Sequence, residues 1–191
     1  GDDEIFSREQ FLQWFNLDHL GRSAAQFDEA KLRWVNAQHL KAMPDEALAS
    51  LVASQLQKRG VLAAPELEDG RLPRICALFK DRCDTTVALT DWAQIFYCDV
   101  VAASTEECDQ YITSEVHPAL DALVEALRDC DWNRQAISAA FKHVLTAHSL
   151  KMPQLAMPVR VLVAGTAHTP SVDALLELMG REKVTGRLQN R

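Results

Sequence analysis

The sequence predicts an all-α fold, and three observations lead to this prediction. Apolar residues recur at the spacing of one helix face along most of the chain. Polar capping residues or prolines stand before these apolar runs, and isolated glycines stand after them. With 48% hydrophobic residues, a chain of 191 residues can bury a substantial core. This length fits one domain or two small ones.

Two helices are expected near the N-terminus. Ser7, followed three residues later by Gln10, is typical of a capping box, and residues 11–17 supply an apolar helix face. Residues 17–25 are expected to form a turn through Gly21. Asp28 then caps a second helix. The buried stripe of this second helix is expected to consist of Leu32, Val35 and Leu40.

A neighbouring face of the second helix combines a cation with an aromatic ring. Lys31, Trp34 and Gln38 fall near one another at helical spacing. A tryptophan beside a lysine can serve RNA binding, whereas a tryptophan of the ordinary core is the alternative. The residues alone leave both interpretations open.

The next helix is expected to open at Pro44 and to end at Gly60, after two cations. Its buried residues would be Leu48, Leu51, Val52 and Leu56. Residues 61–72 are expected to form a loop with a short helix. The carboxylates of this loop could suggest an acid–base pair or a metal site, but no accompanying pattern supports either, and a solvated surface is expected. They are Glu66, Glu68 and Asp69.

From Pro73, a helical run leads into residues 80–86, which carry Arg82. Considered without any relative, Arg82 is best interpreted as a surface arginine paired with Asp81 or Asp84. Residues 87–100 are expected to form a further helix, in which Thr90 is a cap or turn residue.

Two helical patterns follow. Residues 108–127 have the pattern of a long amphipathic helix, and Pro118 near its middle predicts a break or kink. Trp132-Asn133 is expected to start the next helix. The sequence contains no internal repeat, low-complexity tract or glycine-rich phosphate loop.

The C-terminal part combines a cation with two turns. Val159 to Val163 alone could be a short strand, but Pro158 before it and Gly165 after it favour two turns of helix. Arg160 would then lie in the first turn of that helix.

A second helix start follows this segment. Thr169 is the expected N-cap, Pro170 fits the first helical position, and Asp173 brings negative charge to the first turn. We therefore expect one guanidinium group and one helix entry to lie close together.

Composition excludes several classes of function. The five cysteines are odd in number and include no Cys-x-x-Cys pair, which argues against disulfides and a zinc site. No apolar run approaches the roughly 20 residues of a membrane span, and the acidic N-terminus fits no signal or transit peptide, so a cytoplasmic location is expected. Nothing marks an activated nucleophile, and we expect no catalytic residue and no metal ligand.

Charge is distributed unevenly. The net charge of −7 alone speaks against nucleic-acid binding. Residues 1–150, however, contain 14 Lys and Arg against 24 Asp and Glu, whereas residues 151–191 contain 6 against 3. The basic end is therefore the end that carries Arg160.

Two stretches of the sequence resemble one known family. The run Met157-Pro158-Val159-Arg160 through Gly165 precedes Thr169-Pro170 and then Leu178-Met179-Gly180-Arg181-Glu182. Nearer the N-terminus stands Phe27-Asp28-Glu29-Ala30-Lys31-Leu32-Arg33-Trp34-Val35-Asn36. In this order and at this separation, the stretches resemble motifs of bacterial glutamyl-tRNA synthetases, Pro-x-Arg-x-x-x-x-Gly with a Gly-Lys-Glu-like turn and Phe-Asp-x-x-Lys-Leu-x-Trp-x-Asn. Met179 and Arg181 depart from the commoner Leu and Lys.

The resemblance covers nearly the whole chain and implies its organisation. Residues 1–43 would be a helical remnant of the stem-contact domain, and residues 44–95 and 96–191 would be two small helical subdomains that form an anticodon-binding cage. The family's His-Ile-Gly-His-like and Lys-Met-Ser-Lys-Ser-like motifs, which lie upstream, are absent here. The resemblance therefore implies a fragment of a class I glutamate–tRNA ligase that is inactive alone. ATP and Mg would belong to the missing catalytic domain, with no cofactor in the fragment.

The resemblance also implies a partner and a site. The partner would be the anticodon arm of tRNA(Glu), bound by a monomer, with no DNA and no membrane. Arg82 and Arg160 match the two arginines that are associated with the third and first anticodon bases, and Arg82 implies discrimination against tRNA(Gln). The loop and helix start that pack on the anticodon bases are matched by Thr169, Pro170 and Val172. A signature near the tRNA body is matched by Lys31, Trp34 and Asn36.

A helical protein-interaction module without any RNA role is the alternative. It would account for the acidic surface and would use Trp34 and Trp132 as contact anchors. The two readings differ in whether Arg82 and Arg160 face the same groove, which the sequence does not show.

Overall fold

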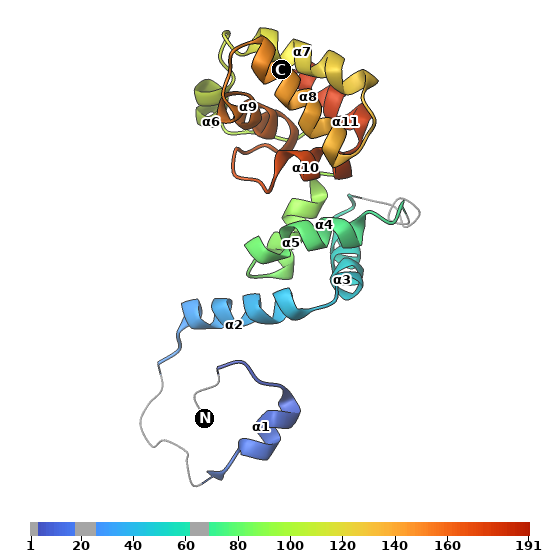
Figure 1. Ribbon diagram of the computed structural model, residues 1–191. Helices are drawn as coiled ribbons and strands as arrows, with labels where there is room; N and C mark the ends of the chain where they lie inside the picture. The colour runs from blue at the N-terminus through green and yellow to red at the C-terminus, as the bar shows by residue number, and fades with distance from the viewer. Residues whose placement is uncertain (1–3, 18–25, 62–68) are drawn as a thin grey trace.

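The computed structural model describes residues 4–17, 26–61 and 69–191, and within these ranges the chain is helical without strands (Figure 1). The all-α prediction is thereby confirmed. The elements are α1 (Arg8–Trp14), α2 (Glu29–Ala42), α3 (Asp45–Lys58), α4 (Leu72–Phe79), the short 3-10 helix η3 (Lys80–Arg82), α5 (Thr86–Gln94), α6 (Thr105–Tyr111), α7 (His117–Asp129), α8 (Arg134–Ala147), α9 (Met152–Ala164), α10 (Val172–Met179) and α11 (Arg181–Gln189).

Several helix starts follow from side-chain caps. Ser7 forms the predicted capping box, Asp28 caps α2, and Asn133 caps α8. At α5 the cap is Thr85 and not Thr90. Thr90 is buried inside the helix. Its hydroxyl donates to the Thr86 carbonyl at 2.8 Å, so it has a hydrogen-bond partner without contacting water.

Prolines also mark helix starts, although not always the expected ones. Pro118 lies in the first turn of α7, so the predicted break divides residues 105–129 into α6 and α7. Pro153 opens α9, whereas Pro158 lies inside that helix. The prediction that Arg160 occupies a first turn was therefore wrong. An interior proline lacks the N–H that would bond to the carbonyl four residues earlier and crowds that carbonyl, yet α9 continues through Pro158.

The start of α10 also differs from the prediction. Its N-cap is Ser171, and Thr169 lies two residues earlier, buried, with its hydroxyl donating to the Pro170 carbonyl at 3.1 Å. Asp173 does lie in the first turn, as expected, and Gly165 ends α9 in the left-handed conformation. The hydroxyl of Thr169 thus bonds within the loop and does not cap α10.

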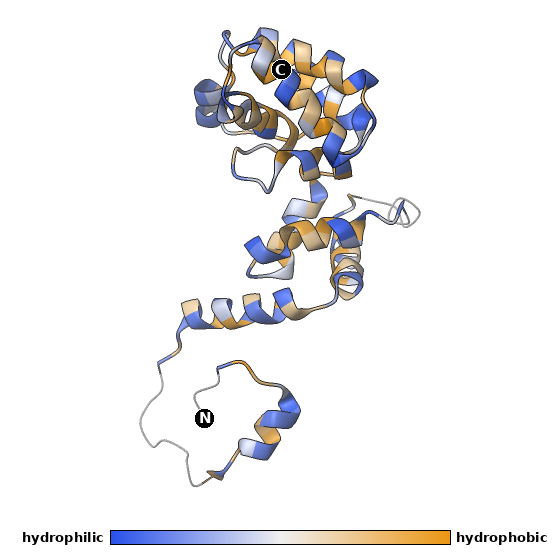
Figure 2. Ribbon diagram, viewed as in Figure 1, coloured by the Kyte–Doolittle hydropathy of each residue, from blue (hydrophilic) through white to orange (hydrophobic). Residues whose placement is uncertain are grey.

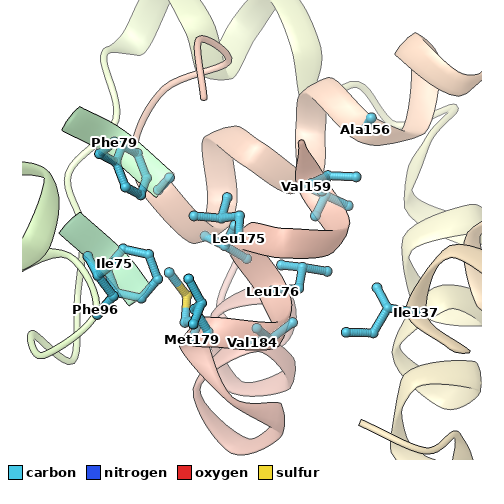
Figure 3. Packing of buried hydrophobic residues seen from close by; sticks show 14 of the residues in the cluster. Ile75, Phe79, Phe96, Ile137, Ala156, Val159, Leu175, Leu176, Met179 and Val184 are labelled. Carbon is cyan, nitrogen blue, oxygen red and sulfur yellow. The ribbon is translucent and has the colours of Figure 1, made fainter. Parts of the chain in front are cut away.

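One continuous apolar cluster runs through α3–α5 and α7–α11. Figure 2 shows the apolar residues gathered on the inner faces of these helices. Helix α10 occupies the junction, and Figure 3 shows Ile75 of α4 and the neighbouring Phe96 facing its Leu175 and Met179. We refer to α3–α5 with η3 as the first helical group and to α6–α11 as the second helical group.

The N-terminal helices bury little. No residue of α1 is buried, and α2 buries only Leu40. The predicted burial of Leu32 and Leu51 was wrong, since they are 53% and 45% exposed. Apolar residues at helical spacing are buried only where a second element covers that helix face. No described helix covers Leu32 or Leu51. Of the predicted turn at residues 17–25, only residue 17 lies within the described residues. The carboxylates Glu66 and Glu68 lie outside them.

Gly165 lies where two backbones meet closely. Its φ is +77°, and a Cβ at this position would stand 2.5 Å from the carbonyl oxygen of Ala102. The residue therefore combines a conformation and a proximity that other side chains do not tolerate. The segment that connects the two helical groups is held against the C-terminal end of α9 at this point.

We expect Gly165→Ala to lower the free energy of unfolding by about 2–3 kcal/mol, because the change adds a steric overlap to left-handed strain. Urea unfolding followed by circular dichroism measures the loss. Gly60→Ala isolates the strain, since Gly60 also has a positive φ but open surroundings, and should cost about 1 kcal/mol. Gly186→Ala, in a helix interior with open space, should be neutral or stabilising. Equal losses for Gly60 and Gly165 would contradict the steric argument.

Candidate nucleic-acid interface

Arg160 projects from α9 toward the loop that precedes α10. Its guanidinium donates from Nη2 to the Pro170 carbonyl at 3.2 Å and from Nη1 to the Met157 sulfur at 3.7 Å. Its Nε is buried and has no hydrogen-bond partner among the described residues. A buried donor without an acceptor is unfavourable in the free protein, and a ligand that supplies an acceptor would relieve it.

Arg82 lies close enough to influence Arg160. Burial lowers the pKa of Arg160, and the positive charge of Arg82 lowers it further. Arg82 itself is exposed on η3. The expected pairing of Arg82 with Asp81 or Asp84 is not found among the described residues, and Asp84 instead pairs with Arg33 at 3.1 Å. Two like charges thus share one region without a neutralising carboxylate bonded to either.

The turn that carries Arg82 is held from both sides. Phe79 before it is fully buried and Cys83 after it is 3% exposed. Lys80 pairs with Asp45 at the start of α3, at 2.8 Å. From α2, the side chain of Asn36 donates to the Asp84 carbonyl. Arg82 is therefore exposed at its guanidinium but fixed at its backbone.

The loop between α9 and α10 is also braced at both ends. One carboxylate oxygen of Glu107 accepts from the Thr166 hydroxyl at 3.0 Å and from the Ala167 amide at 2.9 Å. At the other end, Arg134 donates to Ser171 at 3.3 Å and pairs with Asp173 at 3.0 Å. Sequence reasoning missed Glu107 and Arg134, because their partners lie 37 to 60 residues away along the chain.

The ion pair between Arg134 and Asp173 determines the charge state of Asp173 at the start of α10. Burial acts to raise the pKa of Asp173, but hydrogen bonds from Arg134 and Ser171 and the charge of Arg134 outweigh it. The net result is a lowered pKa, which keeps this carboxylate ionised and paired. Asp173, the acidic residue in the first turn of α10, is thus already engaged by Arg134.

The residues predicted from the resemblance fall into two sets. The carbonyl of Pro170 accepts a hydrogen bond from Arg160. The neighbouring side chains of Thr169 and Val172 are only 6% and 9% exposed. A ligand at this loop would therefore meet mainly its backbone and little of these two side chains. The set on α2 lies at a different element. There Lys31 pairs with Glu4 at 2.7 Å and Trp34 is 45% exposed, so the alternative of a core tryptophan was wrong.

The described residues offer no metal site, and their two buried thiols are unreactive. No group of three or more His, Cys, Asp or Glu side chains in these ranges could hold a metal ion. Burial raises the pKa of Cys76 to about 12 and that of Cys83 to about 11, which makes both poor nucleophiles at neutral pH. None of the helices in the described segments is long and apolar enough to cross a membrane.

The fold and the two cations define an all-helical domain in which neither Arg82 nor Arg160 is bonded to a carboxylate of the described residues. A family model described as "Anticodon binding domain" matches residues 29–191. The chain belongs to this anticodon-binding domain family.

Similar proteins agree with this assignment. A glutamate–tRNA ligase of Verminephrobacter eiseniae is 73% identical over the whole of this chain, which spans 40% of that relative. A glutamate–tRNA ligase of Paracidovorax citrulli is 69% identical over 99% of this chain and 39% of its own length. The fold matches 37% of a crystal structure of a glutamate tRNA ligase from Elizabethkingia meningosepticum, with a TM-score of 0.87, 23% identity and 98% of this chain covered. The chain thus spans about 40% of the length of the curated relatives that it matches.

We expect Arg160→Met to raise the free energy of unfolding by about 1 kcal/mol, because it removes a buried unpaired donor and a like-charge repulsion. The Pro170 carbonyl would keep its bond from Thr169. Arg82→Met, at an exposed position, should change stability by less than about 0.5 kcal/mol. Urea unfolding of both variants measures these effects. A clear loss for Arg160→Met would indicate that the guanidinium serves the fold instead of a ligand.

Proposed function

We propose that this chain is the anticodon-reading part of a glutamate–tRNA ligase and that Arg82 and Arg160 contact anticodon bases. Membership of the anticodon-binding domain family supports the class of ligand. The observation that carries the proposal is the pair of neighbouring guanidinium groups, one with a buried unpaired Nε and neither bonded to a carboxylate of the described chain. RNA loops supply the missing acceptors on their splayed bases.

Hydrogen-bond chemistry favours cytosine at such a site. The Watson–Crick edge of cytosine presents two adjacent acceptors, O2 and N3, which match two parallel donors of a guanidinium group. Uracil has a donor at N3, and guanine is larger and turns donors toward the protein. A bidentate contact of this kind discriminates by roughly 1–3 kcal/mol, which corresponds to about tenfold to hundredfold in affinity.

The two arginines are assigned to different bases. Arg82, exposed on its fixed turn, is proposed to read the third anticodon base, which is C in glutamate tRNA and G in glutamine tRNA. Arg160 is proposed to read the first base, with the loop at Thr169, Pro170 and Val172 packing beside it. Lys31, Trp34 and Asn36 are proposed to approach the body of the tRNA.

The whole ligase activity is part of the proposal. The parent protein would attach glutamate to tRNA(Glu) in the cytoplasm, with ATP and Mg bound in a catalytic domain outside this chain. Within this chain, the proposed contribution is selection of the tRNA. Protein interaction alone is the competing function, and exposed Trp34 favours it, but Trp132 donates internally to the Glu177 carbonyl and is not a free anchor.

We expect the chain to bind a glutamate anticodon stem-loop about tenfold to hundredfold more tightly than the same stem-loop with G as its third anticodon base. Fluorescence titrations at two salt concentrations measure this ratio, and binding should weaken with salt because phosphate contacts release counterions. Arg82→Gln should remove most of the ratio. The matched control is Arg128→Gln, which removes another exposed arginine, one that pairs with Glu125.

Three results separate the possibilities. Loss of the ratio in Arg82→Gln but not in Arg128→Gln supports base reading by Arg82. Equal binding of both stem-loops by the unmodified chain would contradict discrimination while leaving RNA binding in place. No binding to either stem-loop at low salt would favour the protein-interaction function.

A further inference from the structure

Arg187, on α11, is the one charged side chain that is buried among the described residues, with 7% exposed. It has no ion pair within these ranges. All five of its N–H donors are nevertheless used. Nε donates to the Asp99 carbonyl at 3.4 Å. The other four donors bind the carbonyls of Val163, Ile95 and Cys98 and the sulfur of Met179.

Three of these five acceptors belong to residues at the ends of three helices, and the other two, the carbonyls of Cys98 and Asp99, follow α5. Ile95 is the C-cap residue of α5, Val163 lies in the last turn of α9, and Met179 is the last residue of α10. Helix C-termini carry partial negative charge, so three of them together stabilise a buried cation without a carboxylate. Burial lowers the pKa of Arg187, but an arginine side chain keeps its proton at neutral pH.

Other cations cross the same junction. Lys183 of α11 donates to the Cys98 carbonyl at 2.9 Å, on the segment that leaves the first helical group. In the opposite direction, Arg71 at the start of α4 donates to the Leu178 carbonyl of α10 at 3.0 Å. Arg74 of α4 pairs with Glu177 of α10 at 2.7 Å. Each helical group thus supplies cations that bind the other, around the apolar contact in Figure 3.

We propose that Arg187 is a positioning residue that fixes the first helical group, which carries Arg82, against α9, which carries Arg160. The inference rests on the proposed function, because its consequence is the separation between two base-reading guanidinium groups. Arg82 and Arg160 belong to different helical groups, so any rotation at residues 95–99 would change that separation. Fixing it before binding avoids an ordering cost when RNA binds.

The test compares Arg187→Met and Arg187→Lys with the unmodified chain, each with and without Arg82→Gln. Methionine keeps much of the side-chain volume but donates no hydrogen bond, and lysine keeps the charge but not the fork of five donors. We expect Arg187→Met to weaken binding of the glutamate stem-loop about tenfold. Arg82→Gln should then have less than about a threefold further effect, because the two arginines no longer act together.

A second measurement reports orientation without RNA. Residual dipolar couplings of backbone amides should fit one alignment tensor for α3–α5 and α7–α9 in the unmodified chain and two tensors in the Arg187 variants. Lys183→Met, which removes one donor to the Cys98 carbonyl and leaves Arg187 in place, should show a smaller change in the same direction. If Arg187→Met does not fold, Arg187→Lys decides.

Several results would overturn the positioning role. One is a folded Arg187 variant with a single alignment tensor and the full effect of Arg82→Gln. Another is unfolding of both Arg187 variants, which would make Arg187 a residue of the core alone. Failure of the unmodified chain to bind RNA would count against the proposed function instead, and the dipolar couplings would still decide whether Arg187 sets the orientation.

Discussion

The packing of α10 is the constraint on which the rest of the structure depends. Six of its eight residues are buried, so both helical groups must close around it. Its C-terminal carbonyls accept from Arg71 of the first group and from Trp132 of the second. Because its first residues follow directly on the loop at Thr169 and Pro170, the burial of this short helix also determines where that loop lies relative to Arg160.

The cations at the junction differ in kind from the two at the proposed interface. Arg187 is buried with every donor used, and Arg71 and Lys183 bind carbonyl groups at the same junction. Arg82 and Arg160 share a region, repel one another and have no carboxylate partner in the described chain. Repulsion of this kind is unfavourable for folding and becomes useful only when an acceptor-rich ligand arrives. The difference separates side chains that hold the fold from those that we propose to read RNA.

The sequence predicted the fold class and several helix starts because these depend on local chemistry. Ser7 and Asp28 cap as expected, Asn133 lies at the expected start of α8, and Pro118 separates two helices. The start of α9 was wrongly expected at Pro158, because Pro153, five residues earlier, fits a helix start equally well. Only packing shows how far α9 extends toward its N-terminus.

The candidate site was predictable only in part. Arg82 and Arg160 came from resemblance, and their proximity is a property of the folded chain. Glu107, Arg134 and Arg187 act on partners far away along the sequence, so no local pattern could mark them. The burial of Leu32 was overestimated because a helical stripe does not reveal whether another element covers it.

The way in which Arg187 is held has a consequence for ionic strength. Its acceptors are backbone carbonyls and a thioether, which carry no net charge and do not titrate. At 0.1 M, salt screens interactions between exposed charges that are more than about 10 Å apart, but it acts little on buried dipoles. The junction should therefore keep its geometry while salt weakens attraction between the domain and phosphate groups. The contacts of Arg187 and the attraction to phosphate are thus set by separate parts of the molecule, and salt acts mainly on the second.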